Sequence, residues 1–167
     1  MGRVLIKYAI LFLVLVLVQV LFLNQVQFSG FANPYIYILF VMLLPVSSPK
    51  SVVLISAFLL GLSVDIFSNT LGMHAVATVF IAYLRPLIIR GITNREEDMS
   101  DYPGLKQNGI GWFFYYTTLM VVLHHLVLFF IEVYTFTNFL ETLYRILLSS
   151  VFSIFVIVLS QFIVFRD

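Results

Sequence analysis

The sequence predicts an all-α integral membrane protein, built as a single bundle of six transmembrane helices. Composition is the first reason, because 62% of the 167 residues are hydrophobic and only 10% are charged, whereas a globular domain carries about 25% charged residues. The second reason is that the hydrophobic residues gather in runs close to the length that spans a bilayer. The third is that nearly all lysines and arginines would lie on the same side of the membrane if each of these runs crosses it. A chain of this length is expected to form one domain.

Six apolar segments approach the length of about 20 helical residues that a bilayer core requires. They cover residues 4–23, 34–46, 52–67, 71–89, 112–134 and 143–165. The first is preceded by Arg3 and has Lys7 near its beginning, so a signal peptide is an alternative, but no A-x-A-like cleavage site comes after it. The second, PYIYILFVMLLPV, is short. Helices are expected because backbone groups in lipid must bond within their own segment, and the alternating polarity of a β-barrel strand is absent from the sequence.

The distribution of basic residues predicts which side each end faces. With six crossings, one end of the bundle holds eight of the nine basic residues: Arg3, Lys7, Lys50, Arg85, Arg90, Arg95, Lys106 and Arg166. Arg145 lies at the other end. Lysine and arginine favour the cytoplasmic side of a membrane. We therefore expect both termini and the loop 91–111 in the cytoplasm, and Arg145 near the outer surface.

Several functional classes are excluded or disfavoured by the sequence. The absence of cysteine excludes disulfides, thiol catalysis and cysteine-based metal sites, and the net charge of +1 indicates no nucleic-acid partner. No nucleophile–base pairing, phosphate-binding glycine loop or HExxH-like motif occurs. The sequence therefore predicts no catalytic residue, no metal and no cofactor, and an intramembrane enzyme is the least favoured alternative.

Small and polar residues recur at helical spacing within four of the segments. Such stripes let helices approach closely and hydrogen-bond to one another, so we expect them to face the interior of the bundle. In the third segment, the packing stripe of Ala57 and Gly61 ends in Asp65. The stripes of the last three segments are His74, Thr78, Ala82 and Arg85; Thr118, Val121, His125 and Glu132; and Arg145, Ser149, Ser153 and Ser160.

Five ionisable residues lie near the predicted outer surface: Asp65, His74, Glu132, Glu141 and Arg145. Four of them, together with two glycines of the turn GLSVDIFSNTLGMHA (residues 61–75), form a candidate partner-binding or structural cluster: Gly61, Asp65, Gly72, His74, Glu132 and Arg145. An ionisable group in a span usually faces protein or water rather than lipid. We therefore expect Arg145 to pair with Asp65 or Glu132. Glu141 is expected in a loop.

Two further sets of polar residues lie away from this cluster. His124 and His125 fall near the middle of the fifth segment on different helix faces. Hydrogen bonds to serine or threonine of a neighbouring helix are expected for them, in preference to a proton relay, and no third ligand for a metal is evident. At the inner end, Arg85 precedes Pro86, and this pair is expected to bend or end its helix and to let Arg85 reach lipid phosphates.

Short motifs occur in a distinctive order along the chain. Asn33-Pro34 opens the second segment and Leu44-Pro45 closes it, and the next turn carries Gly61, Asp65, Gly72 and Ala75 in a G-x-x-x-D-x-x-x-x-x-x-G-x-x-A pattern. Together with the size and the six segments, this order resembles the family of bacterial rod-shape-determining proteins MreD. The resemblance covers most of the chain through its topology, and its distinctive motif spans residues 61–75.

The resemblance implies a non-enzymatic scaffold subunit of the bacterial cell-elongation complex, in the cell inner membrane, that helps direct peptidoglycan synthesis and maintain cell shape. It implies MreC as a direct partner, the MreB cytoskeleton and RodA with its transpeptidase as direct or indirect partners, and contacts with membrane lipids. Whether the chain also forms a homodimer is left open.

The resemblance also implies a fold similar to the substrate-binding S component of energy-coupling-factor vitamin transporters. A transporter's substrate-binding subunit is therefore the alternative function. Such a subunit requires an enclosed pocket with convergent polar groups near the outer surface. Asn69, His74, Glu132 and Arg145 are the main candidates for those groups.

Overall fold

The computed structural model describes residues 2–25, 33–93, 100–134 and 139–164. Six α-helices and one short 3-10 helix occur in these ranges, and no strand: α1 (Gly2–Leu21), η1 (Leu23–Gln25), α2 (Ile38–Leu43), α3 (Lys50–Ser68), α4 (Met73–Ile92), α5 (Leu105–Val133) and α6 (Phe139–Val164). Five of the helices described are long and apolar enough to cross a membrane, all except α2. The predicted all-α membrane protein is confirmed at this level, and the chain is a multi-pass membrane protein by helix length and composition.

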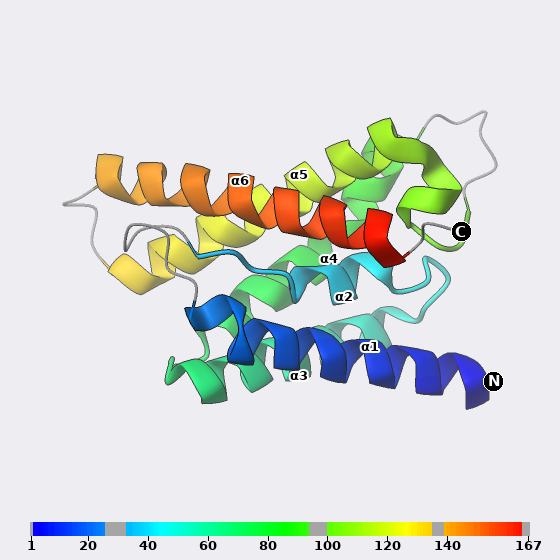
Figure 1. The fold of residues 1–167 in the computed structure, drawn as a ribbon, viewed down its shortest axis with the longest axis horizontal. Coiled ribbons are helices and arrows are strands. Elements are labelled where there is room, and N and C mark those ends of the chain that lie inside the picture. Colours follow the sequence, from blue (N-terminus) through cyan, green and yellow to red (C-terminus); the bar gives the residue numbers. More distant parts are fainter. Residues whose placement is uncertain (1, 26–32, 94–99, 135–138, 165–167) are drawn as a thin grey trace.

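The long helices lie side by side along one common direction (Figure 1). From α3 to α6, each helix packs against the next one in the sequence, and α1 packs against α3. The beginning of α1 and the end of α6 lie at the same end of the bundle (Figure 1). We call this the basic end, because Lys50 begins α3, Arg90 lies in the last turn of α4 and Lys106 lies in the first turn of α5. Arg145 lies in the second turn of α6, at the opposite end.

The second predicted span is the main error of the sequence analysis. The expected helix 34–46 contains only the six helical residues of α2, and residues 33–36 before it are not helical. Neither part lies against lipid, because Tyr35 to Met42 are all buried inside the protein. Non-helical backbone is tolerated at membrane depth only where protein or water satisfies it. The apolar run therefore marks a segment enclosed by the other helices.

This enclosed segment, residues 33–46, still crosses the bundle from one end to the other. The backbone N–H of Asn33 bonds to Ser149, which follows Arg145 by one helical turn. At the other end, the N–H of Val46 donates to the carbonyl of Asp101, just before α5, at 2.8 Å. Figure 1 shows the segment running between the long helices. The segment therefore runs through the bundle without forming a membrane-length helix, because only the six residues of α2 are helical.

Other predicted boundaries also shift. The expected loop 91–111 is shorter, because α4 continues to Ile92 and α5 begins at Leu105; a non-helical Gly109 makes a kink there. Pro86 does not end its helix, since α4 runs through it for six more residues. Arg95 and the acidic residues beside it lie outside the described residues, as does Arg166.

Candidate functional site

Asp65 caps the helix that follows its own. Its carboxylate is buried and accepts hydrogen bonds from the backbone N–H groups of His74, at 3.1 Å, and Ala75, at 2.9 Å. The Thr70 hydroxyl donates to the same carboxylate, and Nδ1 of His74 lies 2.9 Å from it. The first N–H groups of a helix have no intrahelical partner, and the helix dipole favours a negative charge beside them. The beginning of α4 and the turn before it therefore stabilise the Asp65 carboxylate, which would be unstable in contact with lipid.

The turn between α3 and α4 is short because two of its four residues adopt left-handed backbone conformations. Asn69 has a φ of 54° and its N–H bonds to the Asp65 carbonyl, which ends α3. Gly72 has a φ of 82° and immediately precedes α4. A Cβ at Gly72 would meet open space, so its backbone angle, rather than crowding, favours glycine.

Gly61 lets α3 and α4 approach each other closely. A Cβ built at Gly61 would lie 2.5 Å from Cα of Ala75 and 2.6 Å from the carbonyl oxygen of His74. Ala57, one turn earlier on α3, is fully buried. The stripe of Ala57, Gly61 and Asp65 therefore faces α4, as the helical spacing predicts, and the same close approach brings the Asp65 carboxylate to the start of α4.

Arg145 pairs with one of its two predicted partners. Nη1 of Arg145 on α6 lies 2.9 Å from the carboxylate of Glu132 on α5, and the Arg145 guanidinium lies 4.5 Å from the centre of the Phe129 ring. Asp65 is not part of this pair, because α4 occupies its carboxylate. Glu141 lies in the first turn of α6 rather than in a loop. The six residues of the predicted cluster thus divide into a cap between α3 and α4 and an ion pair between α5 and α6.

A polar cavity of about 690 Å³ separates these two groups. Its lining includes polar side chains that are far apart in the sequence: Asn24, Asn33, Thr70, His74, Glu132 and Arg145. Three of the predicted cluster residues therefore face one space, whereas Asp65, Gly61 and Gly72 do not line it. The cavity can hold a small polar molecule or the polar end of a larger one.

Side chains from the surrounding helices satisfy the backbone of the enclosed segment. The Tyr35 N–H donates to Oγ of Ser153 at 2.8 Å, and the Ile36 N–H donates to Oε1 of Gln19 at 2.9 Å. The Gln19 amide also donates to the carbonyl of Pro34 at 3.1 Å. The Gln19 side chain thus accepts from one backbone N–H of the segment and donates to one of its carbonyls, as the backbone of a neighbouring β-strand would. Ser149 and Ser153 of the predicted α6 stripe are buried and bond to this backbone, whereas Ser160 bonds to the Ile157 carbonyl of its own helix.

The two histidines of α5 are part of the same interior. Nδ1 of His125 lies 2.7 Å from the Val121 carbonyl, which accepts only, so Nδ1 carries the proton and Nε2 accepts from Ser153 at 3.2 Å. This confirms the predicted bond to a neighbouring serine. Nε2 of His124 instead lies 2.7 Å from the Tyr37 hydroxyl. No three potential metal ligands gather in the part of the chain that the structure describes.

Replacing Ser153 by alanine is expected to loosen the enclosed segment. The substitution leaves the Tyr35 N–H and the His125 ring without their partner, which costs about 1–3 kcal/mol for each buried group left unsatisfied. The midpoint of thermal unfolding in detergent should fall clearly below that of the unmodified protein.

Ser160→Ala is the matched control, because Ser160 lies on the same helix and bonds only to the Ile157 carbonyl, one turn earlier. This control should change stability by less than about 0.5 kcal/mol. Equal midpoints for the two variants would show that Ser153 does not hold the segment.

Arg85 has a role that the sequence analysis missed. It was expected to extend outward to lipid phosphates, but it is buried inside the protein, with 3% of its surface exposed, and it lines a cavity at the basic end of the bundle. Its guanidinium donates to the Leu44 carbonyl at the end of α2, and Nε donates to the Tyr116 hydroxyl at 3.0 Å. The Tyr116 hydroxyl in turn donates to the Met42 carbonyl at 3.2 Å. Arg85 and Tyr116 therefore satisfy the carbonyls at the end of α2, which have no helical partners.

One expectation about a stripe residue was wrong, and the sequence analysis overlooked three interior residues. Thr118 does not face the interior, and its neighbour Thr117 does. Gln19 was overlooked, although a single amide inside the apolar run LVLVQVLFL is a usable signal: it is costly in lipid and so favours a protein partner. Tyr37 and Tyr116 gave no such signal, because tyrosine is also common at the lipid interface.

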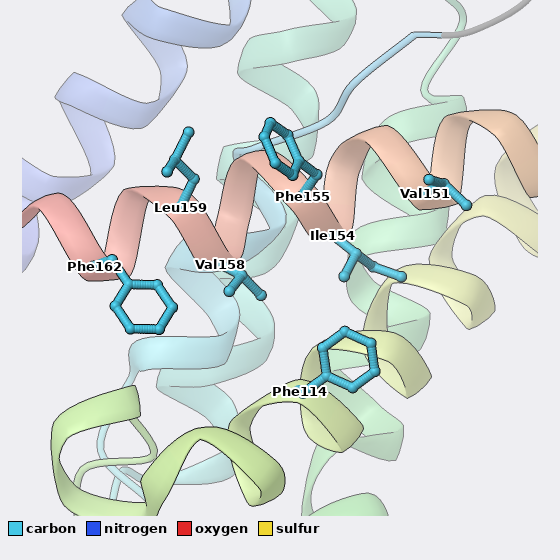
Figure 2. A pocket seen from close by; sticks show the side chains of 7 residues that line it. All are labelled: Phe114, Val151, Ile154, Phe155, Val158, Leu159 and Phe162. Carbon is cyan, nitrogen blue, oxygen red and sulfur yellow. The ribbon is translucent and has the colours of Figure 1, made fainter.

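One surface of the bundle is hollowed and entirely apolar. A groove of about 480 Å³ lies between α5 and α6 and is lined by Phe114, Val151, Ile154, Phe155, Val158, Leu159 and Phe162. In Figure 2, Phe114 of α5 and Ile154 and Val158 of α6 point into the space between the two helices. Phe155 is 63% exposed. An apolar groove on a membrane helix pair receives either lipid chains or another apolar helix.

The helices, the enclosed segment and the inward polar groups define a multi-pass helical membrane protein whose mainly apolar interior contains hydrogen-bonded polar side chains. Comparison with protein families, with curated proteins and with solved structures found no match for this chain. The resemblance to MreD, and the similarity to S components that it implies, therefore stay predictions.

Proposed function

We propose that the chain is a scaffold subunit of the bacterial cell-elongation complex, a member of the MreD family that binds MreC in the inner membrane. The observation that supports this proposal most is the use of the intramembrane polar groups. Asp65, Arg85 and His125 all bond to backbone or side chains of this chain. Groups that hold the fold in this way favour a structural membrane protein over an enzyme.

The partner surface proposed from the sequence needs revision. The Asp65 side chain is not available to MreC, because it is buried against α4. The α5–α6 groove offers an apolar surface of membrane depth instead, and the ion pair of Glu132 and Arg145 lies on the same two helices. MreC crosses the membrane once, and we place its membrane helix in this groove, with its periplasmic part beginning near the ion pair. The MreB cytoskeleton and the RodA–transpeptidase pair would join through MreC or at the basic end.

Photo-crosslinking in cells tests this placement. A photoreactive residue in place of Phe155, in the groove, is expected to crosslink to MreC, and one in place of Ile55, which is similarly exposed on α3, is not. Capture of MreC with the tagged chain in mild detergent tests the partnership itself. Crosslinking from Ile55 alone would move the docking surface to α3, and failure to capture MreC would remove the scaffold proposal.

One observation favours the second candidate, the substrate-binding subunit of a vitamin transporter. The polar cavity lies at the end of the bundle where this function requires a ligand site, and both charges of the Glu132–Arg145 pair line it. A panel of water-soluble vitamins should then raise the midpoint of thermal unfolding for the unmodified protein and not for Glu132→Gln. Under the scaffold proposal, no member of the panel shifts the midpoint.

A further inference from the structure

A second cavity lies at the basic end of the bundle, between the beginning of α3 and the end of α4. Its volume is about 420 Å³. Three basic side chains line it, Lys50, Arg85 and Arg90, together with Ser48 and a set of apolar side chains that includes Val53, Leu54 and Leu87. No carboxylate is among the lining residues that the structure describes. A cavity this basic is suited to an anion.

Arg85 makes this cavity different from a surface patch of basic residues. It is buried, and within the described residues it bonds only neutral oxygens, the Leu44 carbonyl and the Tyr116 hydroxyl. Neither of the two ion pairs in the described part of the chain includes it. A buried charge without an opposite charge is costly. Its hydrogen bonds run through Nε and Nη2, so the Nη1 donors remain for an occupant of the cavity.

The beginning of α3 adds to the positive potential. Pro49 precedes Lys50 at the helix start and provides no side-chain cap, so the first N–H groups of α3 have no side-chain acceptor. Such a helix start attracts phosphate and other anions. Lys50 on α3 and Arg90 on α4 are both exposed and both line the cavity, and their long side chains can extend to an anionic group within it.

We infer that this cavity binds the phosphate headgroup of an anionic phospholipid, with the phosphate held by Lys50, Arg85 and Arg90. The lining carries the argument for a lipid over a soluble phosphate. Val53, Leu54 and Leu87 lie on membrane helices directly beside the three cations. A phospholipid presents its phosphate and its acyl chains together, whereas inorganic phosphate has nothing to place against the apolar side. Basic pockets between transmembrane helices suit anionic headgroups in this way.

The test uses the purified full-length chain in detergent. Added phosphatidylglycerol is expected to raise the midpoint of thermal unfolding by about 5 °C at saturation, because a ligand that binds only the folded state stabilises it. Phosphatidylcholine, which has no net charge, and inorganic phosphate should each raise it much less. An equal shift with phosphatidylcholine would overturn the role of the charges, and an equal shift with inorganic phosphate would overturn the assignment to a lipid.

Variants identify the cavity as the place of binding. Arg85 is left unchanged in them, because it also supports the end of α2. The double variant Lys50→Gln, Arg90→Gln is expected to bind phosphatidylglycerol about tenfold more weakly or worse in a native mass-spectrometry titration. Lys7→Gln is the matched control, since Lys7 is exposed at the same end and does not line the cavity. Loss of binding in Lys7→Gln, or unchanged affinity in the double variant, would contradict the proposal.

Discussion

Replacing Gly61 by alanine is expected to force α3 and α4 apart and to destabilise the protein by about 3 kcal/mol, at the upper end for overpacked cores. The new methyl group would lie 2.5 Å from Cα of Ala75 and 2.7 Å from its nitrogen. These are backbone atoms of α4, so no side chain can rotate to relieve the contact. The separation would also draw the start of α4 away from Asp65, and the cap would weaken with the packing.

Gly91→Ala is the control for Gly61→Ala. Gly91 also lies in a membrane-length helix, α4, but a Cβ there would meet nothing within 4 Å. Alanine has a higher helix propensity than glycine, so this control should be neutral or slightly stabilising. Unfolding of both variants would be followed by the loss of circular dichroism in detergent as temperature rises. A Gly61→Ala protein as stable as the Gly91→Ala protein would show that the two helices can separate at little cost.

Replacing Asp65 by asparagine is expected to cost about 3 kcal/mol, because breaking a buried, hydrogen-bonded charge usually costs this much. Asparagine has the same shape but only one acceptor oxygen. Its NH2 group would replace one of the two oxygens that accept the N–H groups of His74 and Ala75. Two donors would then face each other in a buried site, and the start of α4 would fray.

Glu141→Gln is the matched control for Asp65→Asn, since it removes a carboxylate from the same end of the bundle where the side chain is exposed. It should change stability by less than about 0.5 kcal/mol. Hydrogen exchange of the amides at the start of α4 distinguishes a lost cap from a general loss of stability. Protection of the His74 and Ala75 amides equal to that in the unmodified protein would rule out the capping role.

The sequence predicts the parts of the fold that depend on lipid contact. Long apolar runs show which helices are long enough to cross the membrane, and the helical spacing of Ala57, Gly61 and Asp65 shows which face of α3 packs inward. Shared depth limits the predicted partners of Arg145 to Asp65 and Glu132. Each of these features has a local signal, because the bilayer imposes the same requirement on every span: a length, a cost for charge and a position for basic residues.

The errors share a different physical origin. Residues 34–46 are apolar like a membrane helix, and Arg85 is charged like a residue that contacts lipid phosphates. Both are surrounded by protein rather than by lipid. A buried short helix and a membrane helix have the same hydropathy, so hydropathy alone cannot separate them. Asp65 caps α4, whereas Glu132 pairs with Arg145. Which carboxylate takes which role depends on the distances between helices, and the spacing of residues along one helix does not encode these distances.

The enclosed segment has a consequence for how the protein is made. Its backbone N–H at Tyr35 bonds to Ser153, which the ribosome adds 118 residues later. Until α6 enters the bilayer, that donor has no protein acceptor, and bare peptide groups are not stable in hydrocarbon. We therefore expect the segment to stay in water, or within the insertion machinery, until α3 to α6 have assembled. A nascent chain that stops before Ser149 should leave the stretch between α1 and α3 open to attack by a protease.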